Sequence, residues 1–409
     1  MLTDKKWHHD LFRVIKQYSA KYAEKEALEI TPYIPKKIYE NSIIIPAYNE
    51  SDHFFQRIKN SPLAQSKLLL IVIINQPDSD DDIRINQQLW DRFIESNNTI
   101  NYSHFHHWLT IDNSLLDVLL INRFTEKIPH QQGVGLARKI GGDIICKLIQ
   151  SGCLNNYWIN TTDCDAHLPD NYFSVLYANT TQQHSAAIYP YIHQHSNDTQ
   201  LLEATRHYEQ WLNHYVEQLK KAGSPYAYHT LGSCMASNSL YYCQTRGFPK
   251  RAAGEDFYLL NKLTKLGKVI TLNNTEITLD ARVSDRVPFG TGPAVKKILA
   301  MDNPEEEHLY YHPQCFKELS CLLEGFSTLF TYRESPQIWL RHLSPPLQMA
   351  LNTLGFTKLL IHINKQTLSS EQCYQHCHDW LDGFRTLKLI HLLEENYPRL
   401  PFSKLSLYQ

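Results

Sequence analysis

The sequence lacks a strong charge of either sign. Its 409 residues include 40 lysines and arginines and 42 aspartates and glutamates, which gives a formal net charge of −2. Nucleic acids and anionic membrane surfaces attract proteins through clustered positive charge. The composition therefore gives no basis for nucleic-acid binding, and we expect any anion to be held by a local site.

Long apolar runs are also missing. The longest, residues 68–74, has the length of a strand, whereas a membrane-spanning helix needs about 20 apolar residues. Residues 1–9, MLTDKKWHH, contain no apolar core of the kind found in signal sequences. The nine cysteines are odd in number and scattered over core-like segments, which favours reduced thiols over a disulfide framework. We expect a cytoplasmic protein without a transmembrane segment.

The apolar residues that are present suffice for a large core, because 43% of the chain is hydrophobic and only 20% is charged. The sequence pattern predicts three parts. Residues 1–40 form an N-terminal helical appendage, with one helix over 7–28, and residues 41–299 alternate apolar strands with helices. Residues 300–409 form a helical C-terminal region, with helices predicted over 317–330, 346–354 and 371–393.

Two carboxylates follow an apolar, strand-like segment in the middle of the chain. Asp163 and Asp165 are two residues apart, so on an extended chain they point to one side while Cys164 turns to the other. Open α/β sheets bind ligands at strand ends, and paired carboxylates suit Mg²⁺ or Mn²⁺, whose remaining positions are filled by substrate phosphates and water. Alternatively, the pair belongs to a solvated turn that caps a helix starting near Asp170.

Two earlier apolar strands also end in polar loops. Residues 42–45 lead through Pro46 to Tyr48, which could stack on a base, and to Glu50, which could form hydrogen bonds. The second strand, 68–74, ends at Asn75. Parallel strands of this kind predict a nucleotide site at their carboxyl edge. Beyond them, residues 83–96 and 114–124 have helical patterns.

Charged residues accompany three later segments. Arg138 and Lys139 lie on a helix that begins near Gly135 and are available for phosphate or base. Glu255 and Asp256 open an apolar helix over 257–266, where they either favour the helix dipole or supply an ionised catalytic base. Arg282 and Arg286, beside a glycine-rich turn, could bind a diphosphate or form surface salt bridges.

Two groups of potential metal ligands have simpler structural explanations. His104, His106 and His107 alternate as expected for a half-exposed strand. Cys373 and Cys377 are one helical turn apart, whereas structural zinc usually needs four ligands.

Taken together, the motifs carry a resemblance to a known family. Five of them occur in order: IPAYNE at 45–50, GLAR at 135–138, DCD at 163–165, GS at 232–233 and GEDF at 254–257. This set resembles family 2 glycosyltransferases of the GT-A fold over about residues 40–295, and the segment 282–292 looks like that of a bacterial subgroup. The resemblance implies an α/β fold with a GT-A type doubly wound mixed sheet flanked by helices, and helical N- and C-terminal additions.

The resemblance also implies residue roles. The nucleotide pocket would be lined by Pro46, Ala47, Tyr48, Glu50 and Asn75, together with the cationic residues Arg138, Arg282 and Arg286. Asp163 would approach the ribose, Asp165 would hold Mn²⁺ or Mg²⁺, and Asp256, next to Glu255, would deprotonate the acceptor. The third metal ligand, often a histidine in this fold, has only His308 and His312 as candidates. Asn75-Gln76-Pro77-Asp78 replaces the usual Asp-Asp-Gly-Ser sequence, which leaves the choice of uracil or guanine open.

The predicted function is a metal-dependent glycosyltransferase that moves a sugar from a UDP- or GDP-linked donor to an unknown acceptor hydroxyl, with inversion. The C-terminal helices could cover the acceptor or form a homodimer contact. A sugar-phosphate nucleotidylyltransferase is an alternative, although its Gly-rich, Arg-Lys-containing loop directly after the first strand is absent. A non-catalytic sugar-nucleotide-binding protein is another, and the presence of both Asp165 and Asp256 argues against it.

Overall fold

The computed structural model describes residues 5–30, 37–194, 196–282 and 290–408. The chain divides into two units. The first unit contains residues 1–197 and 230–289, and the second contains 198–229 and 290–409. The sequence-based boundaries after residues 40 and 299 stay predictions.

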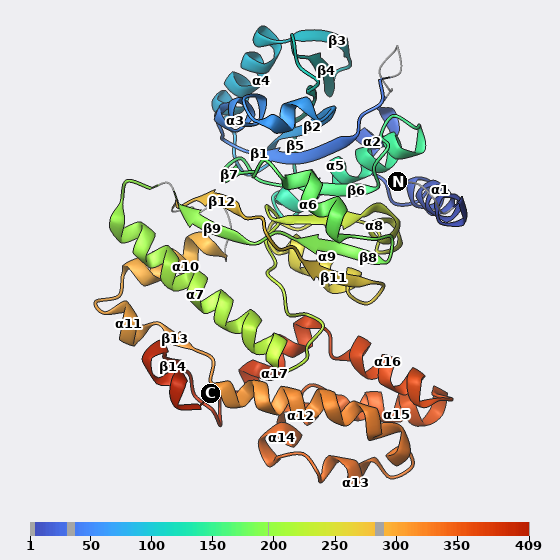
Figure 1. The fold of residues 1–409 in the computed structure, drawn as a ribbon, viewed down its shortest axis with the longest axis vertical. Coiled ribbons are helices and arrows are strands. Elements are labelled where there is room, and N and C mark those ends of the chain that lie inside the picture. The colour runs from blue at the N-terminus through green and yellow to red at the C-terminus, as the bar shows by residue number, and fades with distance from the viewer. Residues whose placement is uncertain (1–4, 31–36, 195, 283–289, 409) are drawn as a thin grey trace. The chain divides into compact units, whose positions relative to one another are not determined.

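The first unit is built on a nine-stranded mixed sheet with the order β11-β8-β10-β6-β1-β2-β5-β4-β3 (Figure 1). Its strands are β1 (Asn41–Ala47), β2 (Leu68–Pro77), β3 (Asn98–Tyr102), β4 (His106–Thr110), β5 (Asp117–Ile128), β6 (Trp158–Thr161), β8 (His184–Ile188), β10 (Met235–Asn238) and β11 (Lys268–Thr271). Strand β1 runs parallel to β2 and β6, and β2 runs parallel to β5. Their carboxyl ends therefore share one edge of the sheet.

Helices cover both faces of this sheet (Figure 1). The helices and short 3₁₀ turn of the first unit are α1 (Lys5–Ser19), α2 (Lys25–Glu29), α3 (His53–Lys59), η1 (Pro62–Gln65), α4 (Arg84–Ser96), α5 (Gly133–Gln150), α6 (Tyr172–Asn179), α8 (Ser239–Gln244) and α9 (Glu255–Leu263). Ile43 and Ile45 share a buried core with Phe55 of α3 and Phe93 of α4.

The residue between them, Ile44, faces the opposite way and packs on α5, where a Cβ on Gly141 would lie only 2.5 Å from Ile44 Cγ2. Alternation along β1 thus fills two cores, and each fully buried isoleucine contributes roughly 1.5–3 kcal/mol. The predicted α/β class, with a doubly wound mixed sheet flanked by helices, is confirmed.

A small second sheet continues from the end of β6. It has the order β7-β12-β9 and consists of β7 (Ala166–His167), β12 (Ile277–Asp280) and β9 (Tyr191–Gln194). The linking residues include Asp163 and Asp165, and the Asp280 N–H donates to the carbonyl oxygen of Asp165 at 3.0 Å. The two carboxylates therefore lie at the junction between two sheets.

Asp143, on α5, joins the N-terminal helices to the sheet layer. This carboxylate is 1% exposed and accepts hydrogen bonds from Tyr18 (2.5 Å) and Tyr242 (2.9 Å), and from Lys139 Nζ (2.9 Å). The backbone N–H of Glu24 also donates to it, at 2.9 Å. The single helix predicted over 7–28 is wrong, because the helix is interrupted between α1 and α2. There the Glu24 N–H donates to Asp143 instead of to a helical carbonyl oxygen.

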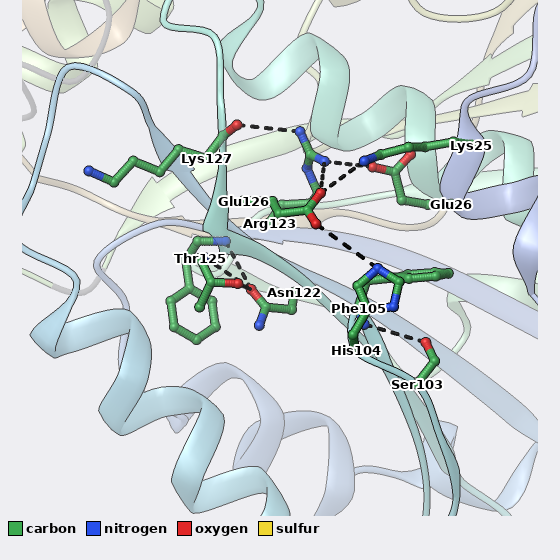
Figure 2. Close-up of polar contacts among 11 residues, drawn as sticks. Lys25, Glu26, Ser103, His104, Phe105, Asn122, Arg123, Thr125, Glu126 and Lys127 are labelled. Carbon is green, nitrogen blue, oxygen red and sulfur yellow. Dashed lines mark hydrogen bonds and ion pairs between the residues drawn. The ribbon is translucent and has the colours of Figure 1, made fainter.

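A second buried ion pair joins α2 to β5. Arg123 Nη1 lies 2.8 Å from Glu26 Oε1 and 3.7 Å from Glu126 Oε2 (Figure 2). The helix predicted over 114–124 is wrong, since most of this segment belongs to β5. A short apolar run inside a sheet has no period that distinguishes it from a buried helix, which explains the error.

The second unit is mainly helical, as predicted for the C-terminal region. Its elements are α7 (Thr199–Lys221), α10 (Thr291–Leu299), α11 (Pro304–Glu307), β13 (Leu309–Tyr310), α12 (Pro313–Leu329), η2 (Phe330–Tyr332), α13 (Pro336–Leu340), α14 (Pro345–Thr353), α15 (Phe356–Gln366), α16 (Ser370–Trp380), α17 (Gly383–Leu393), β14 (Leu400–Pro401) and η3 (Phe402–Tyr408). The predicted helix over 371–393 is two helices, because Asp382 caps α17 by accepting from the Arg385 N–H at 3.0 Å. Cys373 and Cys377 are fully buried in the core of this unit.

In the described ranges, no helix combines the length and the apolar character needed to cross a bilayer.

The Asp143 network generates a prediction about stability. Asp143→Ala should lower the free energy of unfolding by roughly 3–5 kcal/mol, because it leaves the Lys139 ammonium buried without its carboxylate. Urea denaturation followed by circular dichroism measures the loss. Asp10→Ala is the control, because its partner Arg13 is exposed and such surface pairs contribute at most about 1 kcal/mol. Equal losses in the two variants would contradict a stabilising role for the buried network.

Candidate active site

The loop after β6 presents alternate side chains to opposite sides. The side chains of Asp163 and Asp165 are 35% and 21% exposed, whereas Cys164 is buried and its Sγ lies 3.5 Å from the carbonyl oxygen of Pro46. This is the alternation expected for an extended segment. The contact with Pro46 also places the two carboxylates beside the end of β1.

Arg282 bridges this loop to the loop after β1. Its Nη2 lies 2.8 Å from Asp165 Oδ2, and its Nη1 lies 2.9 Å from Glu50 Oε1. Burial, together with the nearby Asp163 and Glu50, raises the pKa of Asp165 to about 6, although the Arg282 guanidinium opposes the shift. The site therefore concentrates negative charge that one cation only partly balances.

Arg138 organises the opposite side of the site. It is 3% exposed, and its guanidinium donates to Thr161 Oγ1 at 3.2 Å, to Asp163 Oδ1 at 2.5 Å and to Glu255 Oε1. Gly232 makes room for it, because a Cβ at that position would lie 2.3 Å from Arg138 Cζ. The assignment of Arg138 to the nucleotide pocket stays a prediction.

Lys139 is not available for phosphate or base as the sequence suggested. It is 5% exposed, and its Nζ lies 2.9 Å from Asp143 Oδ2 and 2.6 Å from the Tyr18 hydroxyl. The interpretation of Lys139 as a ligand for phosphate or base is therefore wrong. Neighbouring helical residues point about 100° apart, so Arg138 faces Asp163 and Glu255 while Lys139 faces Asp143.

Asp256 lies in the first turn of α9, two residues after Gly254, whose φ of +72° suits glycine. Its Oδ1 accepts from the Phe257 N–H at 2.6 Å. Burial and repulsion from Glu255 together raise the pKa of Asp256 to about 7, while Arg138 and the N–H groups of Phe257 and Gly232 oppose the shift. The position at a helix N-terminus therefore does not keep this pKa low, because desolvation outweighs the dipole.

The loops after β1 and β2 are joined by Asn86, which the sequence analysis missed. This fully buried residue of α4 accepts from the Asn49 N–H at 2.9 Å and donates to the Asn75 carbonyl at 3.2 Å and to Gln76 Oε1 at 2.5 Å. The Tyr48 hydroxyl closes the connection by donating to Asp80 at 2.5 Å. Asn86 belongs to none of the motifs. The sequence feature that could have indicated its role is a polar residue on the apolar side of an amphipathic helix.

Arg57 of α3 is a second residue that no motif indicated. Its guanidinium donates to the carbonyl oxygens of Cys164 at 2.5 Å and Ala166 at 3.4 Å. These carbonyls flank Asp165, so Arg57 holds the backbone on both sides of that carboxylate.

The remaining predicted residues belong to the second unit, to β4 or to the part of the chain that is not described. Arg286 is outside the described residues. His308 and His312 belong to the second unit, where His312 Nδ1 accepts from the Gln314 N–H at 3.0 Å and caps α12. Of the three histidines predicted on a strand, His106 and His107 lie in β4, whereas His104 precedes it in the bend between β3 and β4.

The side chains of the site fit a divalent cation only if a bound ligand supplies further coordinating oxygens. Within the described ranges, no three histidine, cysteine, aspartate or glutamate side chains are grouped so that they could hold a metal ion. Asp163 and Asp165 nevertheless offer two hard carboxylates, and Mg²⁺ and Mn²⁺ commonly take one or two of these and complete their coordination with phosphates and water. The residues present therefore fit a metal that binds together with a diphosphate.

No protein-family model matches this sequence, and neither does any curated protein sequence. Among solved structures, one similar chain is the mannosyltransferase PcManGT from Pyrobaculum calidifontis in complex with GDP-Man and Mn²⁺. It has a TM-score of 0.35 and 15% identity, and the match covers 91% of this chain and 95% of that one.

A second similar structure is GalNAc-T7 with UDP, GalNAc and Mn²⁺, with a TM-score of 0.33, 13% identity, and coverage of 76% of this chain and 60% of that one. TM-scores below 0.5 do not establish a common fold or activity. The functional assignment therefore depends on the side chains described above, and membership of family 2 and of a bacterial subgroup stays a prediction.

Asn86 generates a prediction about the loops at the sheet edge. In Asn86→Ala, hydrogen exchange should become faster at the Asn49 amide and in residues 75–77, because both loops lose their common partner. Mass-spectrometric exchange of the protein without ligand measures this. Gln87→Ala is the matched control on the same helix, since the Gln87 amide contacts only the exposed Asp91 at 2.8 Å. Unchanged exchange in both loops would mean that Asn86 does not join them.

Proposed function

We propose that the chain is a metal-dependent glycosyltransferase of the GT-A type, which moves a hexose-like sugar from a nucleoside-diphosphate donor to an acceptor hydroxyl. One observation carries the proposal. Asp163 is connected through Arg138 to Glu255, the neighbour of Asp256, so the carboxylates suited to a metal and the carboxylate suited to proton transfer belong to one ionic network.

The donor would lie along the carboxyl edge of β1, β2 and β6. Its nucleoside half would contact the segment 46–50 and Asn75, whose positions Asn86 sets through hydrogen bonds. The Asn75 amide oxygen is buried and has no hydrogen-bond partner in the described structure, which supports a polar ligand there. UDP- and GDP-linked sugars are the donor classes to test.

Asp163 and Asp165 would hold Mn²⁺ or Mg²⁺ together with the diphosphate. When bound, the cation would stabilise the negative charge that develops on the leaving nucleoside diphosphate. Arg282, whose guanidinium lies 2.8 Å from Asp165 Oδ2, could also contact those phosphates.

Asp256 would act as the general base in an inverting transfer. Its carboxylate accepts the proton of the acceptor hydroxyl as the hydroxyl oxygen attacks the anomeric carbon. The bond between that carbon and the phosphate oxygen breaks, and the nucleoside diphosphate leaves. A base is most effective when its pKa lies near the working pH, and the raised pKa of about 7 for Asp256 meets this condition. Glu255 is less suited, because its carboxylate is held by Arg138.

The proposal is tested by a thermal-shift screen of nucleoside diphosphates and their sugars with and without Mn²⁺, followed by a transfer assay with any sugar that binds. A selective ligand raises the melting temperature by mass action. Binding without transfer to any acceptor or to water would indicate a binding protein. Release of pyrophosphate from a nucleoside triphosphate and a sugar phosphate would indicate a nucleotidylyltransferase.

The two carboxylates after β6 should have separable effects on ligand binding. Asp165→Asn should remove most of the Mn²⁺ dependence of nucleoside-diphosphate binding, because a hard divalent cation prefers charged oxygen ligands. Asp163→Asn should weaken nucleotide binding itself more than its metal dependence. Calorimetric titrations with and without Mn²⁺ measure both effects, and circular dichroism checks the fold. If Asp165→Asn keeps the full Mn²⁺ dependence, the metal assignment is wrong.

The base assignment generates a prediction about rate and pH. Asp256→Asn should lower turnover by about 10²–10⁴-fold while donor binding persists, because general-base catalysis is typically worth that much. In the wild type, kcat/KM should rise about tenfold per pH unit below the Asp256 pKa of about 7 and level off above it, as the carboxylate loses its proton. The variant should lose this rise.

Glu255→Gln is the control for this experiment, since it changes the adjacent acid and keeps a group that can accept from Arg138. It should lose less turnover and keep the rise of kcat/KM with pH, but the midpoint of the rise should move to lower pH, because the repulsion from Glu255 is removed. A variant lacking Asp256 that retains near-normal turnover would place the base elsewhere, and a larger loss in Glu255→Gln would reverse the two roles.

A further inference from the structure

Arg282 differs from the other arginine of the site in how firmly it is held. Its side chain is 36% exposed and lies two residues beyond the end of β12, and its guanidinium pairs with the carboxylates of Glu50 and Asp165. Arg138, by contrast, is almost fully enclosed by Thr161 and two carboxylates. Only the Arg282 contact can therefore be broken by moving one partly exposed side chain.

A divalent cation would compete with Arg282 for Asp165. Glu50 and Asp165 carry two negative charges and Arg282 carries one positive charge. A divalent cation on Asp165 would bring three positive charges against the same oxygens, and the Arg282 fork already uses Asp165 Oδ2 at 2.8 Å. Like charges this close, in a partly buried site, repel strongly.

We propose that Arg282 and the divalent cation exchange on Asp165. The guanidinium bridges Glu50 and Asp165 until the cation binds, and it is then released toward the diphosphate that accompanies the cation. This inference rests on the proposed function for the identity of the diphosphate, but the exchange itself concerns only the chain and the cation. A planar guanidinium is suited to both partners, because it forms paired hydrogen bonds with carboxylates and with phosphates.

The exchange has a consequence for binding. The cation alone binds weakly, because it must displace Arg282 from Asp165 and leave the guanidinium with one of its two carboxylate partners, Glu50. A nucleoside diphosphate gives the released guanidinium a new partner, so cation and nucleotide strengthen each other's binding by the same factor. Arg282 thus acts as a positioning residue that favours loading of the two ligands together.

The decisive experiment compares wild type and Arg282→Gln in a titration with Mn²⁺ alone. Electron paramagnetic resonance of the free ion measures how much Mn²⁺ is bound. The variant should bind Mn²⁺ about 5- to 150-fold more tightly, the usual range of such coupling. Asp165→Asn in either background should remove this binding. Arg282→Gln that binds Mn²⁺ no more tightly than wild type would overturn the exchange.

Arg399→Gln is the matched control, because Arg399 also forms a two-pronged contact with a carboxylate, Glu394, at 2.8 and 3.1 Å and is 33% exposed. It frees a carboxylate in the second unit and should leave the affinity for Mn²⁺ unchanged. An equal gain in this control would mean that any freed carboxylate binds Mn²⁺, which would overturn the exchange. Arg282→Lys provides a second test if Arg282→Gln does not fold, since a lysine keeps the charge but not the fork and should give an intermediate gain.

A second titration with UDP and GDP tests the release toward phosphate. In wild type, Mn²⁺ should strengthen nucleotide binding, and this gain should shrink in Arg282→Gln. An undiminished gain would overturn the release. If neither nucleotide binds the wild type in the presence of Mn²⁺, the proposed function and the release fail together, while the titration with Mn²⁺ alone still decides the exchange.

Discussion

The buried guanidinium of Arg138 is the interaction on which the candidate site depends. It lies on α5 and contacts Asp163 after β6 and Glu255 at the start of α9, so three elements far apart in the sequence meet at one cation. Breaking such a contact from one side leaves a charge buried without a partner, which typically costs about 3–5 kcal/mol. The relative position of the metal-type carboxylates and of Asp256 is therefore held by charge as well as by packing.

The position of Arg138 depends in turn on its own helix. The next residue, Lys139, pairs with Asp143 on another side of α5. Asp143 also accepts hydrogen bonds from Tyr18, from Tyr242 and from the Glu24 N–H between α1 and α2. Helix α5 is thus fixed on one side to the N-terminal helices and on another to the sheet edge that carries the candidate site. Glycines allow the close approach: Gly141 lies against Ile44 of β1, and Gly232 lies against the Arg138 guanidinium.

Burial decides the protonation of the site. A helix N-terminus favours a negative charge by typically 0.3–1 kcal/mol, whereas removing a carboxylate from water costs considerably more. At Asp256 the second effect prevails and its pKa rises to about 7, and at Asp165 a cation is needed to offset the same penalty. Carboxylates that are costly to keep charged are suited to exchanging protons and cations, which is the chemistry we propose for them.

Much of this protein could be predicted from the sequence alone, because local patterns determine local structure. The apolar runs of β1 and β2, the helical pattern of α4 and the alternation of Asp163, Cys164 and Asp165 all depend on neighbours along the chain, and each was predicted. The motifs after the apolar strands also predicted that the candidate nucleotide-binding residues lie at the carboxyl edge of the sheet.

Tertiary structure decided what depends on distant partners. The segment around Val118 is a strand because β2 and β4 flank it, not because of its own period. Lys139 is enclosed because Asp143 and Tyr18 are there to receive it, and Asn86 and Arg57 join the loops of the site through backbone groups that no motif marks. The raised pKa of Asp256 likewise arises from burial by surrounding elements, and a sequence does not specify burial at a single residue until the fold has formed.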